Sequence, residues 1–494
     1  MISSPRMRTL LGERGDVVVF LTALVFRLIW IATLENRLNW FDEREFAAIA
    51  RHLADGDGYV SSSFRANPTV AVYLALVFRF FGENYAVARI GQSLMGAAAC
   101  VFVARTARAL VGPAAGLFSG FLLAMYPPHI FLSGVFYVDT WLTFFCALTV
   151  YLTVQIAQGR GGLAMALVCG VSQGLTMLTR PAFIAFLPGP MLAWMVSEAP
   201  LRARRALICG VFVLGAAATV LPWAYRNDRI FGRPMIASGF WVMLWRGNHE
   251  LANGGADDRL LHWGTPTWEE RLQTLPEERQ RELRAEYAQL DRRAVERSRA
   301  LGDADLALDD VLRPLAIDAI MSHPGRTVRL VIKKVGTLFS AFTETSSTNE
   351  GLTETGDHAV VEYRWLATLS FYPLLAMAAA GAVLGWPRRR ELAPIYFLIV
   401  SVTGTYALLT ACTRFRLPLD PFLIVLSSLA VARIVEALRR APVAAIRSDS
   451  GAVSRAAPAA VASMRQDEAR FAVSAAPRRG MPLRNGPNEG TNHV

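Results

Sequence analysis

Long apolar stretches separated by short polar segments dominate the pattern of this chain, and 53% of its 494 residues are hydrophobic. An ideal membrane-spanning helix needs ~20 apolar residues. We find about ten stretches of nearly that length, at 17–34, 85–111, 114–131, 139–157, 162–178, 182–196, 206–222, 366–386, 391–410 and 417–436. The pattern therefore predicts an all-α polytopic membrane protein with about 10 transmembrane helices.

Two further apolar stretches do not read as spans. Pro68–Phe81 is short and is interrupted by Arg79, which favours an interfacial or re-entrant helix on the outer face. If this stretch crossed the membrane, every later basic cluster would move to the outside. By the same reasoning Val328–Phe342, with Lys333 and Lys334, is expected to lie flat on the outer surface.

The net charge of +11 resembles that of a nucleic-acid-binding protein, but its distribution argues against such a partner. The basic residues cluster in short loops between the apolar stretches. These clusters follow spans two, four, six, eight and ten, so they all lie on the same side of the membrane. The positive-inside rule makes that side cytoplasmic. We expect a bacterial inner-membrane protein with both termini in the cytoplasm, the first span retained as an anchor, and no nucleic-acid partner.

This topology divides the chain into five parts. They are a cytoplasmic N-terminus (1–16), an N-terminal transmembrane module (17–222) with an outer loop at 35–84, an outer periplasmic segment (223–365), C-terminal transmembrane helices (366–440) and a disordered cytoplasmic tail (441–494). Within the outer segment, Pro276–Ser298 reads as a solvated helix. The five cysteines lie in apolar segments and are expected to be buried thiols rather than disulfides.

Two acidic positions stand out on the predicted outer face. Asp42 and Glu43 follow the first span and open an amphipathic helix, although the helix dipole alone also favours acids in a first turn. Asp139 is the only charged residue between Arg108 and Arg160. A charge at membrane depth costs about 2.5–3.5 kcal/mol, which suggests a functional role, with a helix N-cap as the alternative.

Arginines accompany these acids at the outer ends of other spans. Arg180 is the only charged residue between Arg160 and Glu198, and Arg226, Arg414 and Arg416 occupy similar places. Each could extend toward lipid head groups, or could bind the phosphate of a lipid-linked donor. Acids and arginines on one face suit transfer of a sugar from a polyprenyl phosphate, with a carboxylate as base. The nucleotide-binding pattern GxxxxGK is missing.

At these motifs the chain resembles bacterial membrane glycosyltransferases of the C-type (GT-C) superfamily, over roughly residues 15–440. More narrowly, it is similar to the protein O-mannosyltransferase (family 39) and aminoarabinose-transferase-like group, which uses polyprenyl-phosphate sugars. The resemblance rests on FDEREFAAIARHLADGDGY (41–59), residues 67–112, YPPHIFLSGVFYVDTWLTFF (126–145), LTRP (178–181) and PWAYRNDRIFG (222–232).

The resemblance implies a role for each matching position. Asp42 would be the catalytic base with Glu43 beside it, Asp139 a second acidic site residue, and Arg180 and Arg414 ligands of the donor phosphate. The chain departs from the family at Arg65-Ala66-Asn67-Pro68, where many relatives have a basic residue and two prolines, and its outer segment is short. The acceptor could therefore be a lipid, a glycan or a protein.

Several alternatives stay open at this point. A divalent metal is conceivable, since His249 and His262 lie in the outer segment, although a lone histidine in a polar loop more often has no such role. A transporter or flippase for a lipid-linked sugar is the main alternative function. Charges gathered at one face, rather than at the bilayer midplane, argue against transport. A scaffold protein would leave Asp139 and Arg180 unexplained.

Overall fold

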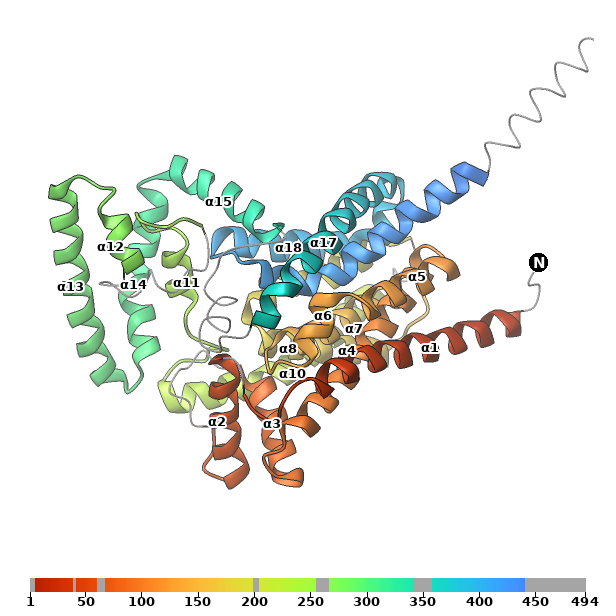
Figure 1. The fold of residues 1–494 in the computed structure, drawn as a ribbon, viewed down its shortest axis with the longest axis horizontal. Coiled ribbons are helices and arrows are strands. Elements are labelled where there is room, and N and C mark those ends of the chain that lie inside the picture. Colours follow the sequence, from red (N-terminus) through yellow and green to blue (C-terminus); the bar gives the residue numbers. More distant parts are fainter. Residues whose placement is uncertain are drawn as a thin grey trace, which may run out of the picture. The chain divides into compact units, whose positions relative to one another are not determined.

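The computed structural model describes residues 5–38, 41–59, 67–198, 204–254, 266–340 and 358–439. Helices make up the regular structure of these residues, and no β-strand occurs among them (Figure 1). The predicted all-α class is therefore confirmed. The predicted tail at 441–494 and His262 lie outside the described residues. Residues from Arg433 onward form a unit separate from Met1–Ala432, and the site described below lies wholly in the larger unit.

Helices coincide with every predicted span. Among the described residues, six helices are long and apolar enough to cross a membrane. They are α1 (Pro5–Ala32), α4 (Tyr85–Leu110), α7 (Asp139–Ala157), α10 (Arg205–Phe231), α18 (Arg389–Leu408, preceded by η4, Trp386–Arg388) and a helix that includes residues 420–439. Shorter apolar helices fill other predicted places: α8 (Leu163–Thr179) and η1 (Pro181–Phe186) with α9 (Pro188–Val196). The remaining place is filled by Thr368–Leu384, the apolar part of α17 (His358–Leu384). The count of ten spans remains a prediction.

The third predicted span is a bent pair of helices. α5 (Pro113–Ala124) and α6 (Pro127–Ser133) meet at 55°. Pro127 and Pro128 cannot donate backbone hydrogen bonds, so the helix cannot continue through them. The buried guanidinium of Arg27, on α1, donates to the carbonyl of Ala124 at 3.4 Å, where α5 ends. The break thus obtains a hydrogen bond from a neighbouring helix.

Close helix contacts assemble the membrane region. α4 packs against α1, α5 and α7, and α8 packs along α10. The α8–α10 contact depends on Gly170, because a Cβ there would lie 2.0 Å from the carbonyl oxygen of Phe212. Small residues at such positions let helix backbones approach closely.

Two short helices extend from one end of the bundle of apolar helices. α2 (Phe41–Asp55) and α3 (Pro68–Phe81) pack together through Phe46, Ile49 and Leu74 (Figure 1). α3 has the limits that its apolar pattern predicted, and its far side exposes Phe80 at 75%. An exposed aromatic residue at this position supports the prediction of an interfacial helix.

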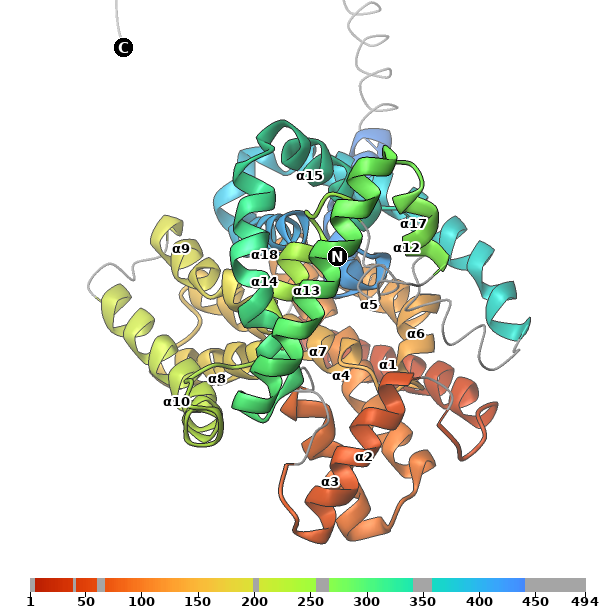
Figure 2. The ribbon, with the colours of Figure 1, turned by 90° about the vertical axis from the view of Figure 1, so that its left-hand side faces the viewer.

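The outer segment forms its own helical cluster. It comprises α11 (Phe240–Arg246), α12 (Pro266–Leu272), α13 (Glu277–Leu301), α14 (Ala304–Met321) and α15 (Pro324–Leu338). Figure 1 labels all five, and Figure 2 shows α12 to α15 from another side. Trp245, Trp268, Tyr287 and Leu312 form its core. The helix predicted at Pro276–Ser298 is α13. The helix predicted at Val328–Phe342 begins four residues earlier, because Pro324 favours a first helical turn, and it ends at Leu338 with Phe339 as its C-cap.

Candidate active site

Four of the predicted site residues come together. Asp42 lies in the first turn of α2, Asp139 begins α7, Arg180 follows α8, and Arg414 lies in η5 (Thr413–Leu419). Asp139 Oδ1 is 3.8 Å from Arg180 Nη2, and Asp139 Oδ2 is 3.6 Å from Arg414 Nε. Arg414 Nη1 is also 3.4 Å from Asp42 Oδ2. Arg414 therefore bridges two acids that are far apart in sequence.

Asp139 is held by charge rather than by hydrogen bonds. Its side chain is fully buried, and neither carboxylate oxygen has a hydrogen-bond partner among the described residues. Val138, not Asp139, is the N-cap of α7, and no side-chain cap bond forms there. The capping alternative is therefore wrong. A buried carboxylate without hydrogen bonds is retained only at a cost, and two arginines offset that cost here.

Aromatic rings hold the two arginines in place. The guanidinium of Arg414 lies 4.4 Å from the ring centre of Tyr137, and that of Arg180 lies 4.8 Å from the ring of Phe415. The Arg180 Nη1 atom is 3.4 Å from the Tyr406 hydroxyl. Burial, followed by the nearby charge of Asp42, raises the pKa of Tyr137 and keeps it a neutral phenol. Stacked guanidinium groups keep their N–H edges free for anions.

The two acids differ in access. The Asp42 side chain is 39% exposed, whereas that of Asp139 is 0% exposed. A molecule arriving from solvent can therefore reach Asp42 but not Asp139. Asp42 is the carboxylate with access to an incoming hydroxyl group.

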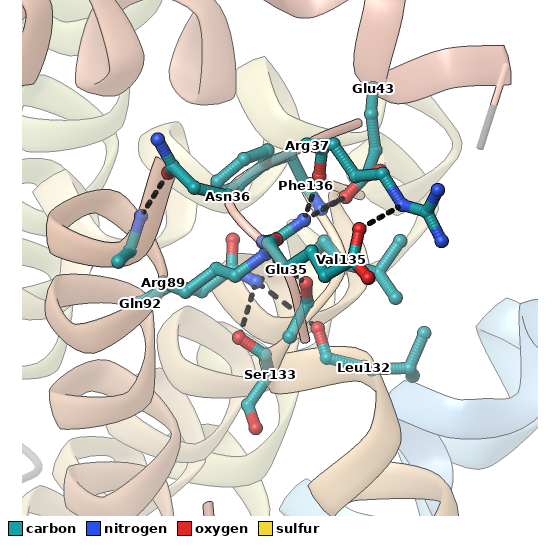
Figure 3. Close-up of polar contacts among 12 residues, drawn as sticks. Glu35, Asn36, Arg37, Glu43, Arg89, Gln92, Leu132, Ser133, Val135 and Phe136 are labelled. Carbon is teal, nitrogen blue, oxygen red and sulfur yellow. Dashed lines mark hydrogen bonds and ion pairs between the residues drawn. The ribbon is translucent and has the colours of Figure 1, made fainter. Parts of the chain in front are cut away.

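Unlike the half-exposed Asp42, Glu43 is buried and points toward Phe136 and Arg89 (Figure 3). Its buried carboxylate accepts a hydrogen bond of 2.9 Å from the backbone N–H of Phe136 and lies 3.9 Å from Arg89. Arg89 in turn donates to the carbonyls of Glu35, Arg37 and Gly134. This network joins the start of α2 to the loop that precedes Asp139.

Gln92 extends the same network along α4 (Figure 3). Its amide donates to the carbonyls of Leu132, Ser133 and Val135, and its oxygen accepts from the Trp141 indole. Sequence analysis missed both Arg89 and Gln92. The signal for Arg89 was present, because a charge within a predicted span requires a partner.

Arg226 and Arg416 make other contacts. Arg226 lies 4.8 Å from the ring of Trp223 and donates to the carbonyl of Tyr59. Arg416 is buried, pairs with Asp420 at 2.9 Å, and donates to the carbonyls of Leu338 and Ser340. Their role as phosphate ligands remains a prediction, and these contacts account for both side chains without it.

His249 is buried and stacked on Trp245, and burial lowers its pKa to about 3. Within the described ranges, no group of three or more histidine, cysteine, aspartate or glutamate side chains is arranged to hold a metal ion. The predicted burial of the cysteines is confirmed for four of the five, with Cys209 half-buried, and all five are free thiols.

Sequence comparison bears on the region that contains Asp139 and Arg180, two of the four site residues. Residues 65–223 match the family of dolichyl-phosphate-mannose-protein mannosyltransferases. The predicted resemblance to the GT-C superfamily is confirmed. The chain is also 31% identical, over 185 residues, to the lipid A galacturonosyltransferase RgtD of Rhizobium johnstonii. That alignment covers 36% of this chain and 38% of the relative, so the chain matches well under half of it.

Two solved structures have a fold similar to that of this chain. The chain is similar to the archaeal oligosaccharyltransferase AglB from Archaeoglobus fulgidus, in complex with an inhibitory peptide and a dolichol-phosphate, with a TM-score of 0.51 and 18% identity. The oligosaccharyltransferase from the same organism in its apo form gives a TM-score of 0.52 and 17% identity. In both cases 88% of this chain matches 52% of the other, so it spans about half their length.

Proposed function

We propose that the protein is a membrane glycosyltransferase that moves a sugar from a polyprenyl-phosphate donor to an acceptor hydroxyl on the periplasmic face of the inner membrane. One observation carries the proposal. Arg414 bridges an accessible acid, Asp42, and a buried acid, Asp139, next to a second arginine, Arg180. The site thus offers a base beside a place for an anionic leaving group.

In this mechanism Asp42 acts as the general base. It removes the proton from the acceptor hydroxyl while the hydroxyl oxygen forms a bond to the anomeric carbon of the sugar. The bond from that carbon to the phosphate oxygen breaks, and its electron pair leaves with the polyprenyl phosphate. The exposure of Asp42, at 39%, supports this assignment over Asp139.

Arg180 and Arg414 stabilise the departing phosphate. Negative charge grows on the phosphate as the sugar leaves, and preorganised cations lower the barrier most where charge develops. Asp139 contacts both guanidinium groups and orients them. Asp139 would also balance their charge before the donor arrives, which keeps two partly buried arginines from repelling each other.

The comparisons support a lipid-phosphate donor and suggest an acceptor. The oligosaccharyltransferase of similar fold was solved with a dolichol-phosphate, and the relative of partial sequence identity is named as a lipid A galacturonosyltransferase. We therefore favour an outer-leaflet lipid over a folded protein as acceptor. Galacturonic acid is the first sugar to test on the donor.

The decisive experiment is a transfer assay with purified protein and a panel of radiolabelled polyprenyl-phosphate sugars, with Asp42→Asn beside the wild type. We expect transfer by the wild type and loss of transfer in a variant that remains folded. Transfer retained by Asp42→Asn would refute the base assignment. Movement of intact donor across vesicles without sugar transfer would favour a transporter instead.

A further inference from the structure

Tyr137 borders the active site and carries a hydroxyl group that no contact within the protein explains. Its ring lies 4.4 Å from the guanidinium of Arg414. The rest of its side chain packs against Leu132, Val135 and Leu417, and only 8% of the residue is exposed. An apolar cluster and a cation therefore fix the ring from two sides.

The Tyr137 hydroxyl is open to a partner from outside the protein. It forms no hydrogen bond with another residue of the described ranges. Both carboxylate oxygens of Asp139 are closed off from solvent without a hydrogen bond, but the Tyr137 oxygen does not belong to the atoms buried in this way. Buried phenol groups usually find a hydrogen-bond partner. A hydroxyl at the accessible edge of a buried ring is therefore available to a ligand.

This hydroxyl lies near the charges of both the base and the phosphate ligand. Burial raises the pKa of Tyr137 most, the negative charge of Asp42 raises it further, and the positive charge of Arg414 lowers it. Asp42 and Arg414 are themselves 3.4 Å apart. The phenol thus stays neutral beside this pair, and a neutral phenol can donate a hydrogen bond without adding charge to the site.

The backbone around Tyr137 is held in place before any ligand arrives. The N–H of Phe136 donates to the Glu43 carboxylate at 2.9 Å (Figure 3). The carbonyl of Val135 accepts from the amide of Gln92 at 2.6 Å and from the N–H of Tyr137 at 2.8 Å. A side chain that reads a ligand needs such support, because the ligand group must meet it in one orientation.

The proposed reaction places the sugar next to this hydroxyl. The acceptor oxygen and the phosphate oxygen lie on opposite sides of the anomeric carbon, so the sugar lies against both Asp42 and Arg414, where Tyr137 also lies. We propose that the Tyr137 hydroxyl donates a hydrogen bond to the sugar of the donor, at the sugar hydroxyl next to the anomeric carbon, and thereby selects the sugar. Hydrogen bonds to that hydroxyl strengthen in the transition state of glycosyl transfer. The inference rests on the proposed function.

Removal of one hydroxyl from each side tests this contact. Tyr137→Phe keeps the ring that packs on Arg414 and removes only the phenol oxygen. The donor that the wild type uses is compared with its 2-deoxy form, which lacks the sugar hydroxyl. Tyr396→Phe is the matched control, because the Tyr396 hydroxyl donates to the carbonyl of Ala382 at 3.0 Å and lies about 15 Å along α18 from Tyr406.

The expected results differ between the two donors. With the normal donor, Tyr137→Phe should lower kcat/KM at least about tenfold, whereas Tyr396→Phe should transfer as the wild type does. With the 2-deoxy donor, Tyr137→Phe should equal the wild type, because the hydrogen bond is already missing. The comparison of two proteins on each donor cancels the different reactivity of the donors themselves. The unfolding temperature of Tyr137→Phe should not change, since no bond within the protein is lost.

Two results would overturn the proposal. Transfer of the normal donor by Tyr137→Phe at the rate of the wild type would show that the hydroxyl contributes nothing. An equal loss with both donors would exclude the sugar hydroxyl as its partner, and a lower unfolding temperature in that case would assign Tyr137 to the fold alone.

A binding measurement separates this inference from the proposed function. Full-length protein in detergent micelles is titrated calorimetrically, without acceptor, with undecaprenyl phosphate and with the same lipid bearing each sugar of the transfer panel, galacturonic acid first. Tyr137→Phe should bind undecaprenyl phosphate as the wild type does and the sugar-bearing lipid severalfold more weakly. Equal binding of every sugar-bearing lipid by the two proteins overturns the contact. If the wild type transfers nothing, the proposed function fails, and the titration still decides whether Tyr137 contacts a lipid-linked sugar.

Discussion

The adjacent acids Asp42 and Glu43 should respond in opposite ways to loss of charge. Glu43→Gln keeps the shape of a side chain that is fully buried and can still accept from the Phe136 N–H. It loses the charge-assisted part of that bond and the attraction to Arg89 at 3.9 Å. Asp42→Asn changes a side chain that is 39% exposed. Its neighbouring cation, Arg414, would still be paired with Asp139.

The expected cost follows from these contacts. Hydrogen bonds to charged groups contribute about 1.5–3 kcal/mol against about 1 kcal/mol for neutral ones, and a buried amide without an acceptor costs a further 1–3 kcal/mol. Glu43→Gln should therefore destabilise the fold by about 2–4 kcal/mol and lower the unfolding temperature by several degrees. Asp42→Asn should change stability by about 0.5 kcal/mol or less.

The assay pairs thermal unfolding, followed by tryptophan fluorescence, with sugar transfer. Glu43→Gln should lose stability and retain some transfer, because a displaced site loses up to about 100-fold in rate rather than all activity. Glu83→Gln is the matched control: Glu83 forms an exposed pair with Arg51, worth about 1 kcal/mol at most. A Glu43→Gln variant that is as stable as wild type yet inactive would place Glu43 in the chemistry and refute the anchoring role.

Three further predictions test other parts of the structure. Arg414→Gln should lower kcat/KM by about 100- to 1,000-fold in the transfer assay. Arg414→Lys should recover little of this loss, because an ammonium group lacks the paired N–H donors of the planar guanidinium. Full activity of the lysine variant would contradict phosphate binding by the guanidinium. Gly170→Ala should lower the unfolding temperature by forcing α8 from α10 at a cost of about 1–3 kcal/mol, whereas Gly210→Ala on α10, where a Cβ meets open space, should not. Burial lowers the pKa of Lys334 to about 8 from 10.5, so the unfolded chain binds more protons between these values and stability should rise with pH across that window. Unfolding temperatures measured from pH 7 to 11 should lose this rise in Lys334→Met, and an identical slope in the variant would show that Lys334 is not the titrating group.

The membrane helices and the four central residues could be predicted because their signals are local. An apolar run such as Pro68–Phe81 fixes a helix whatever surrounds it, and the structure has the same limits. Asp139 and Arg180 stood out because each is alone in a long uncharged stretch. Charges so isolated must find each other, and in the structure they do.

The partners of the other arginines could not be predicted in the same way. Arg416 carries the same outer-face signal as Arg414, but it pairs with Asp420 and donates to the carbonyls of Leu338, the last residue of α15, and of Ser340. That choice depends on where α15 lies, which no local pattern specifies. Likewise, Glu43 differs from Asp42 only by its direction on α2, and the loop that it anchors is distant in sequence.

The bend between α5 and α6 has a consequence for how the chain enters the membrane. Arg27 belongs to α1, whereas its acceptor at Ala124 ends α5, which is synthesised well after α1. Until α5 arrives, α1 carries an arginine at a cost of about 2.5–3.5 kcal/mol in the bilayer. α1 should therefore insert inefficiently alone and become secure only when α5 joins it, so the insertion of these two helices is cooperative.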